Sequence, residues 1–314
     1  KKEFIEEQRA WLKGYRKETG LSWSELQKRT GTNSSLSQFG GESGKGYNGK
    51  ELPLAEAVLR YRELLAARDT TFIDAPQIPG FFETQTSEEV FGLLHWGLRG
   101  RMVGAPLGFG CGKSTACEEF QRRYPNVYII DLFKSQGSQG AMQNKVLAVL
   151  GMENTSGAAA TLSEMICARL KQMHRPLLIF DEAQHLTTSA LEEIRGWHQA
   201  TGAGMAFFGD KRLYNLIFHG KGKDDIPQFR RRIRMMRVRL QPYAQDVAAL
   251  AAAWNVHERR MIVELERVAQ TPGALGLATE VLEAAAMFAS AEQKPMDLGH
   301  LQEAVADITH RIAA

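Results

Sequence analysis

The chain has 314 residues, of which 44% are hydrophobic, as expected for a globular protein with about two domains and a small appendage. Its formal net charge of +3 is too small to indicate a partner. The three cysteines lack the spacing of zinc ligands and are typical of reduced intracellular thiols. We find no signal peptide and no apolar run near the roughly 18 residues that cross a bilayer, so we expect a soluble cytoplasmic protein with no membrane partner.

Residues 1–75 are predicted to form a helical DNA-binding domain that ends in a linker. Leu21-Ser22-Trp23-Ser24 can cap a helix that Gly31 ends, and a short polar helix up to Phe39 follows. This order is typical of a helix-turn-helix, although a plain three-helix packing domain remains an alternative. The candidate DNA contacts are the polar residues of the second helix and a lysine in the glycine-rich stretch after it: Asn33, Ser34, Ser35 and Lys45.

Residues 76–240 alternate between helical and strand patterns, which predicts an α/β domain with a parallel sheet. The strand ending at Ala105 leads into Gly110-Cys111-Gly112-Lys113-Ser114-Thr115, a P-loop motif before a helix. In such a loop the backbone N–H groups bind phosphates, a lysine reaches the outer phosphates and a hydroxyl binds Mg²⁺. The predicted ATP-binding residues are Gly108, Gly110, Cys111, Gly112, Lys113, Ser114, Thr115 and, later in the chain, Asp210.

One position departs from the strict P-loop pattern GxxxxGK[ST]. The pattern requires glycine where the chain has Leu107, so the loop looks like G-A-P-G-x-G-K-S with three extra residues. We expect either a longer phosphate loop or a register in which Gly108 and Gly110 make the turn.

A second nucleotide motif is the apolar run Leu177-Leu178-Ile179-Phe180 followed by two acidic residues. Such a run predicts a fully buried strand whose carboxyl end lies near the P-loop. We expect Asp181 to bind Mg²⁺ together with Ser114, and Glu182 to activate the attacking water, while Lys113 contacts the phosphates. The implied cofactors are ATP and Mg²⁺.

Positive charge concentrates between Lys211 and Arg239, where ten Lys or Arg residues stand against two acidic ones. Such a run is the electrostatic pattern of a polyanion-binding surface. The cations after Asp210 are the predicted contacts to double-stranded DNA, and a solvated charged loop is the alternative: Lys211, Arg212, Lys221 and Lys223. Residues 241–314 are alanine-rich and predict an all-helical lid domain.

A P-loop core followed by a helical lid is the layout of AAA+ ATPases, and from Phe82 onward the chain resembles a narrower group. It is similar to the Mu B-like target-DNA activators, AAA+ ATPases of transposable phages and related transposons. The residues that carry the resemblance are Phe82-Glu83-Thr84-Gln85-Thr86, Gly112-Lys113-Ser114, Asp181-Glu182-Ala183-Gln184-His185-Leu186, Leu191-Glu192-Glu193-Ile194-Arg195, Gly209-Asp210-Lys211-Arg212-Leu213-Tyr214 and Thr271-Pro272-Gly273-Ala274-Leu275.

The resemblance implies an ATPase that forms oligomers or helical filaments on largely non-specific DNA and delivers this target to a DDE transposase. It also implies an arginine supplied to the neighbouring subunit's ATP site. Arg232 is the first candidate and Arg231 the second, and the alternative is that the whole run from Arg230 faces DNA.

Two departures from the family pattern predict slow hydrolysis that controls release from DNA. Asp210 stands where AAA+ proteins commonly carry asparagine, and Gly276 stands where the family usually has a lid arginine. Two other functions remain open: an AAA+ ATPase of a secretion or DNA-repair machine, and a nucleotide-binding DNA regulator without turnover.

Overall fold

The structure is a computed structural model of the chain, and it divides into two compact units, Lys1–Ala75 and Pro76–Ala314. It describes residues 2–32, 35–41, 50–73, 78–153, 155–220 and 225–313, without the side chains of residues 35, 66–73 and 309–313. The two units are described separately below.

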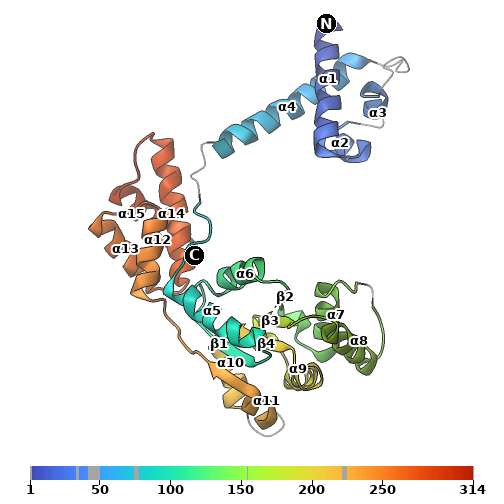
Figure 1. Ribbon diagram of the computed structural model, residues 1–314. Helices are drawn as coiled ribbons and strands as arrows, with labels where there is room; N and C mark the ends of the chain where they lie inside the picture. The colour runs from blue at the N-terminus through green and yellow to red at the C-terminus, as the bar shows by residue number, and fades with distance from the viewer. Residues whose placement is uncertain are drawn as a thin grey trace. The chain divides into compact units, whose positions relative to one another are not determined.

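Four helices make up the described part of the first unit (Figure 1): α1 (Lys2–Thr19), α2 (Trp23–Thr30), α3 (Ser35–Phe39) and α4 (Glu51–Ile73). Helix α2 begins at Ser22, whose side chain accepts from the N–H of Glu25 in a capping box, and ends at Gly31 in the left-handed conformation. Leu12, Leu26, Leu36, Phe39 and Val58 contribute to one hydrophobic core under these helices.

Helices α2 and α3 pack on each other and on α4, and the helix-turn-helix stays a prediction. Asn33, Ser34 and Lys45 lie outside the described residues, as does the side chain of Ser35, the first residue of α3. DNA binding by this unit therefore stays a prediction.

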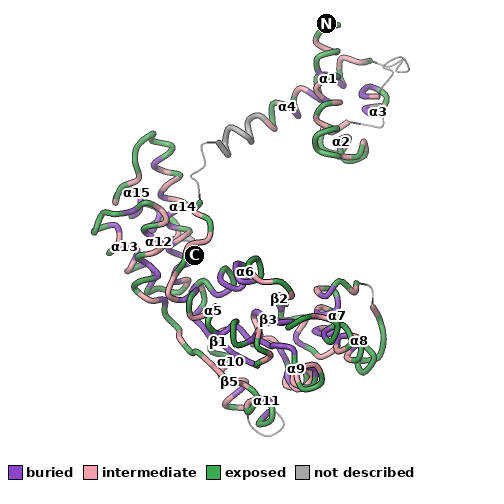
Figure 2. The backbone as a smooth tube through the Cα atoms, viewed as in Figure 1, coloured by how far each residue is buried: buried purple, intermediate pink, exposed green. Residues whose placement is uncertain are grey.

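The second unit is built on a five-stranded sheet with the order β2-β3-β4-β1-β5, in which every pair is parallel (Figure 1). The strands are β1 (Met102–Pro106), β2 (Val127–Asp131), β3 (Leu177–Asp181), β4 (Gly204–Gly209) and β5 (Ile233–Met236). Strands β1, β3 and β4 are wholly buried, as the purple tube in Figure 2 shows.

Alternate strand residues pack against opposite helical layers. Leu177 and Ile179 belong to a core with α5 (Gln85–Leu98) and α6 (Lys113–Arg123), whereas Leu178 and Phe180 belong to a core on the other face. The helices of that other face are α7 (Gln139–Val149), α8 (Ala159–Lys171), α9 (Thr188–Thr201), α10 (Lys211–Phe218) and α11 (Pro227–Arg232). Two short 3-10 turns, η1 (Lys134–Gln136) and η2 (Ala183–His185), follow β2 and β3. The predicted α/β fold with a parallel sheet is confirmed.

The chain ends in four helices with their own hydrophobic core, as predicted: α12 (Ala244–Ala253), α13 (Arg259–Ala269), α14 (Ala274–Ala291) and α15 (Leu298–Ala313). By length and composition α14 could cross a membrane, which the sequence expectation had excluded for the whole chain. One face of α14, with Val281 and Leu282, is buried against the other lid helices, so core packing accounts for its apolar residues.

A buried polar contact joins these four helices to the α/β core. The carboxylate of Asp246 in α12 accepts from the N–H and hydroxyl of Thr86 in α5, and the Arg239 guanidinium donates to the same hydroxyl at 2.5 Å. Arg239 also stacks on Tyr243, with its guanidinium carbon 3.9 Å from the ring centroid. We call Thr86, Arg239, Tyr243 and Asp246 the lid clasp. Because Asp246 is fully buried and hydrogen-bonded, the clasp fixes where α12 leaves the core.

Candidate functional site: a cavity between the phosphate loop and the lid

The departure at Leu107 has a structural cause. Leu107 is buried, forms a parallel bridge with Arg239 and donates its N–H to the carbonyl of Gly209 at 2.9 Å. It therefore extends β1 by one residue between β4 and the segment leading to the lid. Gly108 does not make the turn predicted for it, since its N–H donates to Arg239 at 2.7 Å and a Cβ would stand 2.1 Å from the Leu240 carbonyl oxygen.

The turn of the phosphate loop is made by Gly110 and Gly112. Their φ angles of +73° and +81° lie in the left-handed region, which favours glycine. Gly112 is the N-cap of α6, so the positive N-terminal end of that helix lies at the phosphate loop, as anion binding requires. Phe109, the residue before Gly110, is 75% exposed.

The two nucleotide motifs meet at the carboxyl ends of β1 and β3. The Ser114 hydroxyl donates to the Asp181 carboxylate at 2.5 Å, and both oxygens are ligands that Mg²⁺ prefers. The pair lies at the beginning of α6, and Lys113 is buried beside it. Glu182 follows in the left-handed conformation (φ +53°), a strained backbone that is common at functional sites.

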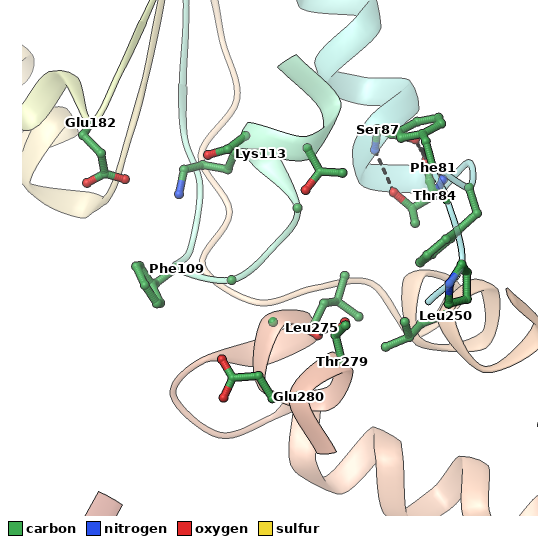
Figure 3. A pocket seen from close by; sticks show the side chains of 18 residues that line it. Phe81, Thr84, Ser87, Phe109, Lys113, Glu182, Leu250, Leu275, Thr279 and Glu280 are labelled. Atoms are coloured by element: carbon green, nitrogen blue, oxygen red, sulfur yellow. Dashed lines mark hydrogen bonds between the residues drawn. The ribbon is translucent and has the colours of Figure 1, made fainter. Parts of the chain in front are cut away.

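A cavity of about 630 Å³ opens beside these groups (Figure 3), a volume suited to a nucleotide-sized ligand. At one end stand the polar Lys113 and Glu182. The other end is apolar, with walls from Phe81, Leu250 and Leu275. Phe82, which follows Phe81, also lines the cavity. A triphosphate at the polar end would leave the base against the apolar wall.

The predicted phosphate-loop residues do not all reach this cavity. Among the described residues, the wall includes Gly110, Gly112, Lys113, Ser114 and Thr115 and does not include Gly108, Cys111 or Asp210. Cys111 is fully buried, and burial raises the pKa of its thiol, so its side chain is part of the packing under the loop.

The lid forms the remaining wall. The N–H of Gly276 donates to the carbonyl of Gly110 at 3.1 Å, so the first turn of α14 rests directly on the phosphate loop. One turn later, Thr279 and Glu280 line the cavity (Figure 3). The lid thus presents a carboxylate here, and Gly276 contributes backbone only.

Asp210 has a different position from the one predicted. Its carboxylate accepts from the backbone N–H of Arg212 at 2.7 Å, which caps α10, and pairs with the Arg212 guanidinium at 2.8 Å. Partial burial raises the pKa of this carboxyl, but the bonds from Arg212 outweigh that effect and hold it below its usual range. The Asp210 carboxylate is therefore hydrogen-bonded within the first turn of α10 and does not face the cavity.

Gln184 is a polar residue of this region that sequence reasoning missed. Its side-chain amide donates to the Glu182 carboxylate, and its carbonyl oxygen accepts from the N–H of Asp210 at 3.3 Å. Gln184 lies two residues after Glu182, but its position in the sequence does not indicate that its side chain reaches the end of β4.

The predicted arginines lie at the amino ends of the strands, opposite to the ends that carry the nucleotide motifs. Arg231 and Arg232 end α11 and are exposed, and the next residue, Ile233, pairs with Met102 at the start of β1. Strand β1, which separates this position from the phosphate loop, has five residues and spans about 15 Å. The two arginines are therefore far from the Lys113 of their own chain. Arg230 bonds to Asp225 at 2.7 Å and to the end of α10.

Of the predicted DNA contacts in this unit, Lys211 and Arg212 are exposed in the first turn of α10. Lys221 and Lys223 lie outside the described residues.

Comparison with known proteins agrees with this arrangement. Residues 108–217 match the AAA domain family, and residues 231–308 match the C-terminal domain of the Mu B transposition protein. The chain is 27% identical over 263 residues to the ATP-dependent target DNA activator B of Escherichia phage Mu, with 83% of each chain covered, and equally to that of phage D108. It is 25% identical over 273 residues to the Mu-like prophage FluMu DNA transposition protein B of Haemophilus influenzae, covering 86% of this chain and 93% of the relative.

Among solved structures, the Walker-type ATPase PABY2304 of Pyrococcus abyssi superposes with a TM-score of 0.52 at 12% identity, over 76% of this chain and 75% of that one. This likeness shows the fold alone. The match to the AAA domain confirms the prediction of an ATPase. The chain matches an AAA domain and, after it, the C-terminal domain of the Mu B transposition protein, which confirms its predicted resemblance to the Mu B-like AAA+ ATPases.

Proposed function

We propose that this chain is an ATP-dependent, largely non-specific DNA-binding protein that oligomerises on target DNA and delivers it to a DDE transposase. In this proposal slow ATP hydrolysis times the release from DNA in the cytoplasm of a bacterial or phage-infected cell. The observation that carries it is the meeting of Lys113, Glu182 and the Ser114–Asp181 pair at one end of a nucleotide-sized cavity. The relatives named as ATP-dependent target DNA activators supply the biological context.

ATP binding follows from the two ends of the cavity. The N–H groups around Gly110 and Gly112 and the Lys113 ammonium would bind the phosphates, while Phe81, Leu250 and Leu275 would contact the base. Ser114 and Asp181 fit a magnesium ion, since Mg²⁺ usually takes one or two protein oxygens and completes its shell with phosphate and water. When bound, Mg²⁺ neutralises charge that develops on the phosphates.

Hydrolysis requires a base beside the γ-phosphate, and Glu182 lines the cavity on the side of Lys113 (Figure 3). A water attacks the γ-phosphorus, the bond to the bridging oxygen breaks, and Glu182 accepts the proton. A cation would stabilise the charge on the transferred phosphoryl group. Arg232, or Arg231, would supply this cation to the site of a neighbouring subunit, because neither lies near the Lys113 of its own chain.

Two features support slow turnover. The Asp210 carboxylate is held by Arg212, so it does not replace an asparagine that orients the water. Gly276 brings no side-chain cation to the γ-phosphate, although its backbone touches the phosphate loop. Each missing donor removes stabilisation of the transition state.

DNA binding is proposed to use phosphate contacts from Lys211, Arg212, Lys221 and Lys223, with the helical first unit adding Asn33, Ser34, Ser35 and Lys45. Contacts of this kind are sequence-independent and weaken steeply with salt. The exposed first turn of α10 supports the first two residues.

Electron microscopy of the purified protein with random-sequence duplex DNA tests the proposal. We expect ATP-dependent oligomers or filaments on any sequence, their loss with ADP, and their persistence in Glu182→Gln because hydrolysis is blocked. Closed rings without DNA would instead favour another AAA+ machine. Nucleotide-independent binding at one operator would favour a regulator without turnover.

A further inference from the structure

Gln184 connects the ends of two neighbouring strands. Its amide nitrogen donates to the Glu182 carboxylate after β3, and its carbonyl oxygen accepts from the N–H of Asp210 after β4. Gly209 makes this approach possible, because a Cβ there would stand 2.3 Å from the Gln184 carbonyl oxygen. The Gln184 side chain therefore packs directly against Gly209, and both the nitrogen and the oxygen of its amide are hydrogen-bonded.

The same contacts continue to the surface. Asp210 binds Gln184 through its backbone N–H and Arg212 through its carboxylate, at 2.8 Å to the guanidinium. Arg212 is exposed and lies in the first turn of α10 beside Lys211. One unbroken series of hydrogen bonds thus runs from Arg212 through Asp210 and Gln184 to Glu182.

We propose that Gln184 is a positioning residue for Glu182 and that it transmits the occupancy of Arg212 by a DNA phosphate to ATP hydrolysis. This inference rests on the proposed function, since it takes Glu182 as the base and Arg212 as a DNA contact. It adds a specific route, through Gln184, by which DNA bound at Arg212 would control ATP hydrolysis.

The physical basis is competition for one guanidinium. A DNA phosphate accepts the same donors of Arg212 that now bind the Asp210 carboxylate. When Arg212 turns to DNA, Asp210 loses an ion-pair partner at the cap of α10 and the N-terminal turn readjusts. Because the Asp210 N–H is bound by Gln184, this readjustment reaches the amide that orients Glu182.

The test measures kcat, the Kd for ATP and the ratio of hydrolysis rates with and without saturating duplex DNA in the full chain. In Gln184→Ala we expect kcat to fall about 10-fold, as for other residues that orient a catalytic group, with the Kd for ATP unchanged. The DNA-dependent ratio should fall to about 1, as expected when coupling free energy is lost. Gln184→Glu can still accept from Asp210 but cannot donate to Glu182, so it should lose kcat equally.

Three further variants separate positioning from damage to the fold. Gly209→Ala displaces Gln184 without changing it and should reproduce the kcat of Gln184→Ala. Arg212→Ala should bring the DNA ratio to about 1 even at saturating DNA, because the transmitting contact is gone. Lys211→Ala is the matched control: it removes the neighbouring cation and leaves the bonds between Arg212 and Asp210 in place, so it should weaken DNA binding and keep the ratio.

The outcomes separate this inference from the proposed function. A wild-type protein that neither hydrolyses ATP nor binds DNA would refute the proposed function. A wild-type protein that does both, but whose hydrolysis ignores DNA or whose Gln184→Ala variant keeps the wild-type kcat and ratio, would refute the role of Gln184 alone. A higher Kd for ATP in Gln184→Ala, with kcat unchanged, would also overturn it.

Discussion

The backbone N–H of Gly276 in the lid donates to the carbonyl of Gly110 in the phosphate loop at 3.1 Å. The approach is closer still at Gly273, whose carbonyl oxygen would lie 1.8 Å from a Cβ on Gly110. The lid and the phosphate loop therefore contact each other through their backbones, so a shift of the lid backbone would displace the loop.

Gly110→Ala should break this contact. The new methyl group collides with Gly273, and the φ of +73° adds strain of about 1–3 kcal/mol, so we expect ATP binding to weaken about 10-fold or more. Titration with a fluorescent ATP analogue measures the loss. Gly112→Ala is the control, because Gly112 also has a positive φ but has open space at the position of a Cβ. If Gly112→Ala weakens ATP binding as much as Gly110→Ala does, backbone strain alone explains the effect.

Gly276→Arg should raise the hydrolysis rate. A Cβ at this position meets the Cα of Gly110 at 3.6 Å, an ordinary contact, so the longer side chain can start without a clash and extend along the cavity wall. One added cation at the γ-phosphate is expected to raise kcat about 10-fold or more. Gly276→Met has similar bulk without charge and should leave kcat unchanged. An arginine variant no faster than the methionine variant would locate the cause of slow turnover elsewhere.

Local patterns predicted the elements well and the loop contacts poorly. The apolar run before Asp181 identified a buried strand, and the Ser22 cap and Gly31 identified the bounds of α2, because each signal lies within a few residues. Leu107 is different. Its role depends on a pairing with Arg239, which is distant in sequence and belongs to a segment without a strand pattern.

The candidate site shows the same limit. Lys113, Ser114 and Asp181 were predicted together because parallel strands bring their carboxyl ends to one edge. Gln184 was missed and Asp210 was predicted to bind ATP, because the sequence does not show which of several hydrogen-bond partners a polar side chain will have. The Asp210 carboxylate accepts from the backbone N–H and the guanidinium of Arg212 and does not line the cavity, since local bonds of this kind compete with longer-range contacts.

Asp246→Ala should loosen the lid clasp. It leaves the Thr86 hydroxyl and N–H and the Tyr243 N–H without their buried acceptor, which costs about 3 kcal/mol. Urea denaturation should show this loss, together with increased proteolysis of α12. Glu303→Ala, at an exposed lid carboxylate, should change stability by no more than about 0.5 kcal/mol. A stable Asp246→Ala variant would show that apolar packing alone holds the lid.

Glu119 should make the stability of the second unit depend on pH. Hydrogen bonds from Arg122 and then Arg123 lower the pKa of this carboxyl to about 2. Because the folded pKa lies below the unfolded one, the contribution is present above the unfolded value of 4.5 and is lost as the pH falls towards 2. Between pH 5 and about 2.5 the Tm of the wild type should therefore fall more than that of Glu119→Gln. Parallel curves for the two proteins would exclude this role.

Arg232→Ala should abolish hydrolysis while keeping ATP binding, because Arg232 lies at the amino ends of the strands and the phosphate loop lies at their carboxyl ends. A trans arginine typically contributes 1,000-fold or more, so a fall in kcat of about 100-fold or greater is expected. Mixing Arg232→Ala with Glu182→Gln should restore activity, since the Glu182→Gln subunit supplies Arg232 to the intact base of its neighbour. Arg237→Ala, at another exposed arginine, should retain its rate. If Arg231→Ala loses hydrolysis and Arg232→Ala does not, the neighbouring arginine takes this role, and if the mixture stays inactive the arginine does not act between subunits.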